Sequence, residues 1–299
     1  MLSLHTNTAA LSTENALNST QASLSNTLTQ LGTGYRVNSA MDDAAGLQIA
    51  TRLTSETQGM TQAQSNTADG ISMLQTADGA LSETSNILLS MKDLATEANT
   101  ASSSAADQTA LQSQYDALGQ QLLQIFQGTT YGGAGLFSTG TAASAVAGNA
   151  GALGAAAGLV FQIGDQAADT MTVNTSAALG ALATALGTAT AQYSAVPPAN
   201  GTELTGGTAG VAITNLTAAI ADVGTLRSQI GAGANRLQDV SANLTNMITN
   251  TTAATGNIMD VNYASASANS SSDQLLLQAG TAALKQANSV SQIVISLLQ

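Results

Sequence analysis

A single long heptad pattern constrains this chain more than any other feature of its sequence. At every seventh position from 53 to 95 the residues are Leu, Met, Thr, Leu, Leu, Leu and Ala, so one of these seven is polar. A repeat of this kind keeps one face of an α-helix apolar along its length. A helix over residues 44–99 would extend on the order of 80 Å at ~1.5 Å per residue. Because so long a helix is stable only against partner helices, the pattern predicts an elongated helical assembly rather than a globular core.

Four further segments show apolar residues at helical steps of three, four or seven, over residues 17–31, 111–125, 216–248 and 276–297. Both ends of the chain are therefore predicted to be amphipathic helices that pair with each other. The apolar stripe of the first segment consists of Leu17, Leu24, Leu28 and Leu31; that of the last consists of Leu276, Gly280, Ala283, Ala287, Val290, Val294 and Leu297.

The middle of the chain has turn residues and short runs typical of strands. Residues 159–163 and 170–175 are predicted to be two strands joined by a turn over 164–169. The Gly/Ala/Thr-rich stretches 138–158 and 176–210 are predicted to be surface loops. Asp165 and Asp169 flank the predicted turn, where Asp is common, so a calcium site is the weaker interpretation.

The charge and residue types exclude several functions. The chain carries 6 basic and 18 acidic residues, for a net charge of −12, which disfavours binding to nucleic acid or to anionic membranes. It has no Cys and a single histidine, His5, so thiolate zinc sites, two-histidine metal sites and thiol nucleophiles are excluded. No cleavable secretory signal and no run of about 18 apolar residues is recognised. All basic residues lie outside the interval 93–222, whose surface is expected to be acidic.

Several polar residues have structural interpretations. Asp42 and Asp43 precede the long helix and are expected to act on its N-terminus rather than as a carboxylate pair. Asp107 is the predicted N-cap of the third helix. Arg227 is expected to pair with an acidic residue of a neighbouring helix. A Gly-Ala-Gly run at residues 231–233 lacks the third glycine and the preceding strand of a dinucleotide loop.

Residues 31–50, which read LGTGYRVNSAMDDAAGLQIA, resemble the amino-terminal region of the bacterial flagellin family. Residues 2–7, 69–81, 223–237 and 278–299 resemble other stretches of the same family. The resemblance covers residues 1–137 and 209–299, at both ends of the chain.

The resemblance implies a mainly α fold: a long coiled-coil or helical-bundle rod formed by paired N- and C-terminal segments, with a small β-hairpin region in the middle. It assigns residues 1–42 to an N-terminal inner coiled-coil domain that pairs with the inner helix 255–299. Residues 43–137 and 209–254 would form the rod domain, and residues 138–208 a variable hairpin and loop region.

The resemblance further implies a secreted, extracellular structural subunit, not an enzyme, that polymerises with itself into the bacterial flagellar filament for swimming motility. Type III export, an export chaperone, a filament cap and hook-junction proteins would be its partners, with no cofactor or metal ion. The residues expected to act in filament assembly are Leu17, Leu24, Leu28, Leu31, Arg36, Asn38, Asp42, Asp43, Asn235, Arg236, Leu276, Val290, Val294 and Leu297.

Two alternatives remain open: a hook-filament junction protein, which shares the terminal helices, and a secreted flagellin-like adhesin. The metalloprotease insert of some flagellins is excluded, because its His-Glu-x-x-His motif is absent. Many flagellins carry Arg-x-Arg-Glu-Leu where residues 90–94 read SMKDL, which implies only weak recognition by an innate immune receptor.

Overall fold

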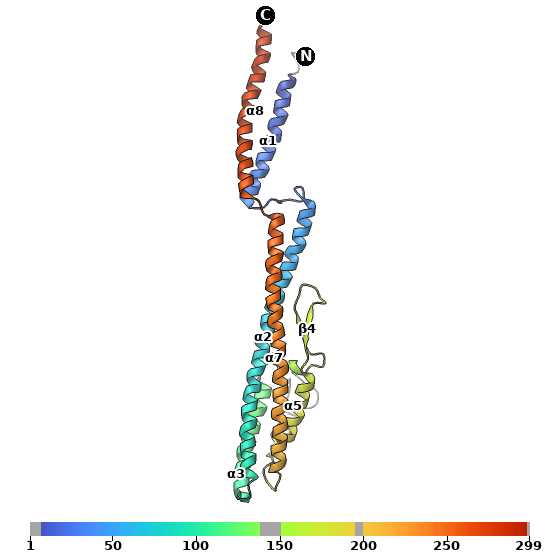
Figure 1. Ribbon diagram of the computed structural model, residues 1–299, viewed down its shortest axis with the longest axis vertical. Coiled ribbons are helices and arrows are strands. Elements are labelled where there is room, and N and C mark those ends of the chain that lie inside the picture. Colours follow the sequence, from blue (N-terminus) through green and yellow to red (C-terminus); the bar gives the residue numbers. More distant parts are fainter. Residues whose placement is uncertain (1–6, 138–150, 195–199, 298–299) are drawn as a thin grey trace. The chain divides into compact units, whose positions relative to one another are not determined.

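The computed structural model describes residues 7–137, 151–194 and 200–297 (Figure 1). At residue 194 and residues 290–297 it describes the backbone alone. The chain divides into two compact units. Unit 1 comprises Met1–Thr57 and Thr249–Gln299, and unit 2 comprises Gln58–Ile248. The domain boundaries expected from the sequence resemblance lie elsewhere, at residues 42 and 255, and stay predictions.

The described residues are mostly helical, with two small antiparallel sheets of two strands each. This confirms the predicted fold class. The helices are α1 (Thr8–Thr33), α2 (Ala44–Ala98), α3 (Ala105–Gly128), α5 (Ser176–Ala189), α6 (Ala191–Ser194), α7 (Ala209–Met259) and α8 (Tyr263–Leu297), with a short 3₁₀ turn η1 (Ala152–Gly154). The strands are β1 (Thr130–Tyr131), β2 (Ala134–Gly135), β3 (Leu159–Gln162) and β4 (Thr170–Val173).

The heptad pattern of α2 corresponds to its buried face. Each heptad position from 60 to 95 is buried, and Leu74, Leu81 and Leu88 are fully so. The one polar member, Thr67, is also buried, and its hydroxyl donates to the Ala63 carbonyl at 2.7 Å. That bond satisfies the hydroxyl within the helix, so the threonine does not interrupt the packing.

In unit 1, α1 and α8 lie side by side (Figure 1). Asn7 caps α1 by accepting from the Ala10 amide at 3.1 Å, and its side-chain amide donates to the Ala287 carbonyl of α8 at 3.0 Å. α1 ends at Gly34, which adopts φ +79 and donates its N–H to the Gln30 carbonyl. A Cβ at Gly34 would lie 3.0 Å from the Tyr263 hydroxyl oxygen, so this position favours glycine for both conformation and space.

In unit 2, the β3–β4 hairpin packs on glycines of the two long helices. The register pairs Phe161 with Met171, which confirms the predicted strands and turn. A Cβ at Gly70 of α2 would lie 2.8 Å from the Phe161 ring, and one at Gly233 of α7 would lie 2.9 Å from a Val173 methyl. The absence of side chains at these positions lets the hairpin approach both helices closely.

The prediction of a surface loop over residues 176–210 is wrong for its first part. Residues 176–189 form α5, and α6 follows directly. Leu182 and Leu186 of α5 are fully buried in the same core as α2, α3 and α7. The Gly, Ala and Thr content suggested a loop, but small residues also permit close helix packing, and the leucines are spaced three and four apart as on one helix face.

The predicted N-cap of α3 is also wrong by three residues. Ser104 is the N-cap, and its hydroxyl accepts from the Asp107 amide at 3.2 Å. Asp107 is the N3 residue instead, and its carboxylate accepts from the Ser104 amide at 3.0 Å. The two residues form a capping box, in which each side chain satisfies the other's backbone amide.

By length and composition alone, α7 could cross a membrane, and it is the one helix among the described residues to meet that test. The core helix of a soluble protein can meet the same test. The buried residues of α7 belong to the same core as those of α2, as expected for such a helix. The described residues contain no group of three or more His, Cys, Asp or Glu side chains that could hold a metal ion.

Candidate assembly surfaces

Three of the four leucines predicted in the first apolar stripe are at least partly buried within unit 1. Leu24 is buried, and Leu17 and Leu31 are half-buried. A Cβ at Gly280 would lie 2.9 Å from a Leu17 methyl, so this leucine fits against a glycine of α8. Leu28, by contrast, is 50% exposed.

The face that α8 turns toward α1 differs from the predicted stripe. From Ala266 to Ala287 its least exposed positions follow alternating steps of four and three: Ala266, Ser270, Asp273, Leu277, Gly280, Leu284 and Ala287. Gly280 and Ala287 were predicted, whereas Leu276 is 54% exposed and the shielded leucine is its neighbour Leu277. Val290, Val294 and Leu297 lie in the last turns of α8, and their side chains are outside the described residues.

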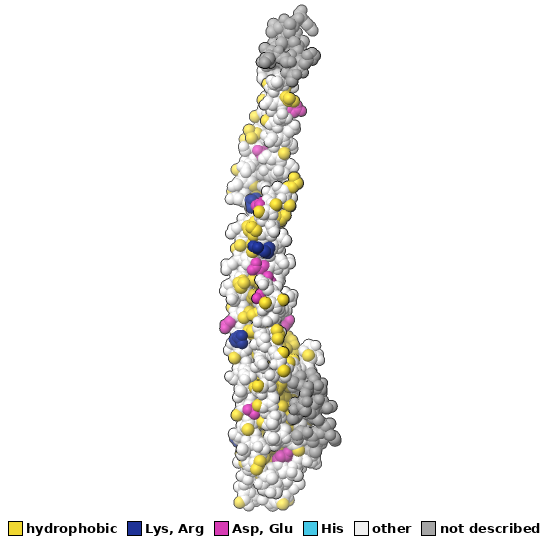
Figure 2. All heavy atoms as spheres, turned by 90° about the vertical axis from the view of Figure 1, so that its right-hand side faces the viewer, with side chains coloured by type: hydrophobic (Ala, Val, Ile, Leu, Met, Phe, Trp, Pro, Cys, Tyr) yellow, Lys and Arg dark blue, Asp and Glu magenta, His cyan; other side chains and the backbone are white. Residues whose placement is uncertain are grey.

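Unit 1 therefore leaves several large apolar side chains exposed. Leu11 and Leu28 of α1 are at least half exposed, and so are Leu275 and Leu276 of α8. On the face seen in Figure 2, charged side chains are sparse and hydrophobic side chains are scattered. Exposed leucines on paired helices are typical of surfaces that other helices cover.

The predicted residues of the segment between α1 and α2 build one hydrogen-bonded loop. The Asp42 carboxylate accepts from the Ser39 amide at 2.8 Å and the Asn38 amide at 3.0 Å, and these bonds lower the pKa of Asp42. The Asn38 side chain donates to the Tyr35 carbonyl at 2.9 Å. Within this loop Met41 is 96% exposed, so a rigid backbone displays a large apolar side chain.

Arg36 joins this loop to the end of α7. Its guanidinium donates to the Ile258 carbonyl at 2.7 Å and lies 3.7 Å from the Asp43 carboxylate. Asp43 also accepts from the Gly46 amide at 2.8 Å and so caps α2. The expectation that the two aspartates act at the helix N-terminus is therefore confirmed for Asp43, whereas Asp42 holds the loop.

The remaining predicted residues lie on α7. Asn235 and Arg236 are exposed in unit 2. Arg227 forms the expected interhelical pair, with its Nε 2.8 Å from the Asp78 carboxylate of α2, and this hydrogen bond raises the pKa of Arg227. Both partners are about 40% exposed, so the pair contributes at most about 1 kcal/mol to stability.

A buried polar network in unit 2 was not predicted. The Gln112 side chain donates to the Asp116 and Glu203 carboxylates, each at 2.9 Å, and accepts from the Leu204 amide at 2.7 Å. Asp116 also accepts from the Gly201 amide at 3.2 Å. The network fixes the segment before α7 to α3. No sequence signal marks it, because its partners are separated by some ninety positions along the chain.

These features define a class: long-helix proteins whose first and last helices pair, with a hairpin packed on two long helices in a second unit. Two family models match the chain, the bacterial flagellin N-terminal helical region over residues 4–142 and the bacterial flagellin C-terminal helical region over residues 213–298. The flagellin of Bacillus subtilis is 33% identical over 98% of each chain. The chain belongs to the bacterial flagellin family.

Other relatives match in part. The B-type flagellin of Pseudomonas aeruginosa is 45% identical over 50% of this chain and 31% of its own length, and flagellin B of Vibrio cholerae is 42% identical over 44% and 35%. The chain thus spans about a third of the length of these relatives. A Vibrio parahaemolyticus structure described as a flagellar hook-associated protein has a TM-score of 0.53 at 18% identity, covering 73% of this chain and all of that one. It shows a shared fold alone.

Proposed function

We propose that this chain is a structural subunit that polymerises with copies of itself into the extracellular filament of a bacterial flagellum, used for swimming. The observation that carries the proposal is the alignment with the Bacillus subtilis flagellin, which extends over 98% of both chains. No step of this function requires catalysis, and we propose that the chain is not an enzyme.

The exposed leucines of unit 1 supply a physical reason for assembly. Leu28 and Leu276 are each about half exposed in the single chain, so covering them with a second copy would stabilise the contact by roughly 1 kcal/mol per side chain. Many such contacts repeated between subunits would produce a stable polymer from individually weak surfaces. In this proposal Leu17, Leu24 and Leu31 hold α1 against α8, while Leu28 and Leu276 contact a second copy.

The other expected residues are assigned to the same role. Arg36, Asn38, Asp42 and Asp43 would keep the loop before α2 rigid, so that it presents one shape to a neighbour. Asn235 and Arg236 would contact a neighbour from α7, and Val290, Val294 and Leu297 would extend the inner helical layer.

The proposal includes a route and a set of partners. The chain would leave the cell through the flagellar type III apparatus with a dedicated export chaperone, and it would add to the filament beneath a cap and beyond hook-junction proteins. A weak interaction with an innate immune receptor, as the SMKDL segment at residues 90–94 implies, would be incidental to assembly.

Electron microscopy of the purified, concentrated protein tests the function directly. We expect long filaments from the parent chain and none from Leu276→Asp, because the new carboxylate would be buried without a partner. The control is Ser272→Asp, which adds the same charge to α8 at an exposed polar position. Short stubs from the parent chain would indicate a hook-filament junction protein, and the absence of any polymer would favour an adhesin.

A further inference from the structure

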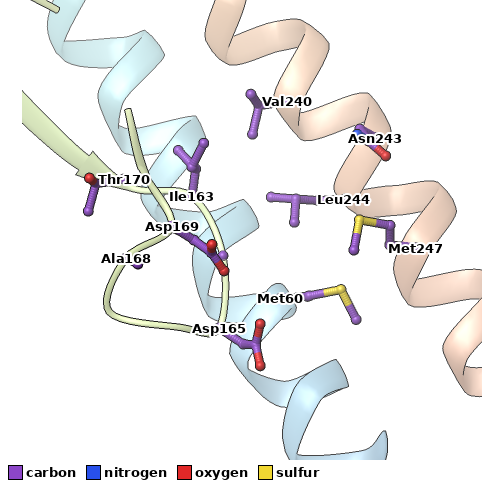
Figure 3. A pocket seen from close by; sticks show the side chains of 11 residues that line it. Met60, Ile163, Asp165, Ala168, Asp169, Thr170, Val240, Asn243, Leu244 and Met247 are labelled. Atoms are coloured by element: carbon purple, nitrogen blue, oxygen red, sulfur yellow. The ribbon is translucent and has the colours of Figure 1, made fainter. Parts of the chain in front are cut away.

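A cavity of about 440 Å³ opens in unit 2 between the β3–β4 turn and the helices α2 and α7 (Figure 3). Met60 of α2 and Leu244 of α7 are buried at its floor, and Met247 and Val240 of α7 extend this apolar surface. Methionine side chains are flexible and fit ligands of varied shape. The floor therefore suits an aliphatic chain rather than one rigid ligand.

Two carboxylates lie at the turn that borders the cavity. The Asp165 carboxylate makes no hydrogen bond or ion pair with any described residue, and the Asp169 carboxylate accepts only from the Gln166 amide, at 3.3 Å. Both side chains are exposed, and no basic side chain of the described residues lies within ion-pairing distance of either. The turn lies close to α2, because a Cβ at Gly59 would be 2.5 Å from the Asp165 Cβ.

We propose that this cavity receives a lysine or arginine side chain from a second copy of the chain. The aliphatic stem of such a side chain would lie on the methionines and Leu244, and its charged end would bond to Asp165 and Asp169. Long basic side chains bury their stems on apolar surfaces and keep their charge at a polar edge, which is the arrangement of groups found here.

Charge complementarity favours a second copy as the source. The chain has six basic residues, and Arg36 and Arg227 are already ion-paired with Asp43 and Asp78. The other four have no ion pair with a described residue: Arg52, Lys92, Arg236 and Lys285. Copies that each carry a net charge of −12 repel one another, so placing one of these cations against two carboxylates offsets that repulsion where the copies meet.

This inference rests on the proposed function and identifies one contact within the polymer. The test begins with Asp165→Lys in the full chain, because Asp165 bonds to no described residue and its replacement should leave the fold unchanged. We expect the concentration needed for polymerisation to rise about tenfold or more, with the thermal unfolding of the monomer unchanged. Asp165→Asn, which removes the charge but keeps the size, should give a smaller rise.

A second set of variants identifies the occupant. Arg52→Glu, Lys92→Glu, Arg236→Glu and Lys285→Glu are each combined with Asp165→Lys, and one combination should restore polymerisation. The control is Asp69→Lys, which makes the same charge change at an exposed position of α2 in the same unit and should polymerise like the parent.

Each contrary outcome has a separate meaning. If the parent chain forms no filaments, the proposed function fails and this inference fails with it. If the parent polymerises and Asp165→Lys does so equally well, the inference alone is overturned. It is also overturned if Asp69→Lys loses assembly to the same extent, or if none of the four Glu variants restores assembly to Asp165→Lys. A Glu variant that acts by stabilising the monomer would overturn it too, since the occupant would then belong to the same chain.

Discussion

Glycines in α2 have two opposite effects on stability: they weaken the helix, and at Gly70 the missing side chain leaves room for the hairpin. Replacing Gly70 and Gly79 with alanine, one at a time, should separate these effects. In a helix interior, Gly→Ala stabilises by about 0.5–1 kcal/mol, because alanine loses less backbone freedom on folding. At Gly79 the new methyl would meet nothing within 4 Å, so the full gain is expected. At Gly70 it would lie 2.8 Å and 2.9 Å from two Phe161 ring atoms and 3.1 Å from a Leu237 methyl, distances that force the hairpin or the ring to move.

The magnitude follows from the cost of overpacking. Adding a methyl to a filled site costs about 1–3 kcal/mol, so Gly70→Ala should be neutral or destabilise by up to ~2 kcal/mol after the helix gain is included. The two variants should therefore differ by ~1–3 kcal/mol. For a unit of this size each kcal/mol shifts the melting temperature by about 2–4 °C, which gives a difference of roughly 2–12 °C.

Thermal unfolding of the monomeric variants, followed by circular dichroism, measures this difference. Because both substitutions are chemically identical and lie on the same helix, changes in helix propensity cancel between them. Equal shifts in the melting temperature for the two variants would refute the conclusion that the hairpin packs against α2 at Gly70.

Four further outcomes are expected. Tyr115→Phe should destabilise by about 1–3 kcal/mol, measured by urea unfolding, because the buried tyrosine hydroxyl donates to the Ala189 carbonyl at 2.6 Å and its loss leaves that acceptor unpaired. Leu182→Ala should cost about 2–5 kcal/mol in the same assay, whereas a loss below 1 kcal/mol would show that α5 is not part of the core. Ser104→Ala should cost about 1 kcal/mol by removing the N-cap of α3. Hydrogen bonds from Ser104 lower the pKa of Asp107 below its usual 3.8. The contribution of this carboxylate to folding stability is therefore present above pH 3.8 and is lost as the pH falls through the lowered pKa. An NMR titration that finds the pKa of Asp107 unshifted would contradict the capping box.

The long helix was predictable because its signal is local and repeated. The heptad from 53 to 95 fixes both the helical period and the face that must be covered, and the positions from 60 to 95 are buried as that pattern requires. The strands β3 and β4 were predictable for a similar reason, since short apolar runs flank a turn rich in Asp and Gly.

α5 was missed because its composition and its spacing point in different directions. Small residues and threonines are common in loops. Only packing against α6 and η1, in a core shared with α3 and α7, makes the leucines of this segment a buried face. The face of α8 was ambiguous for another reason. Residues 275–277 are three consecutive leucines, and a helical period alone cannot say which of them turns toward α1.

The candidate assembly surfaces were likewise predictable from the sequence only in part. The loop residues Arg36, Asn38, Asp42 and Asp43 could be singled out from their motif. The hydrogen bond of Arg36 to the Ile258 carbonyl of α7, and that of the Asn38 amide to the Asp42 carboxylate, were seen only in the folded chain. The cavity at the β3–β4 turn had only a faint sequence signal, two aspartates in a turn. Its floor comes from α2 and α7, which are distant in the sequence.

By itself, the sequence determined that this chain forms long helices that need partners, because the spacing of apolar residues is a local property that each helix expresses alone. It also determined the family, through motifs at both ends. Only the tertiary structure decided which leucines are covered within one chain and which are left for another, because burial depends on what packs opposite. The same holds for the buried network around Gln112 and for the turn over the cavity, where residues far apart in the sequence meet only once the helices are in place.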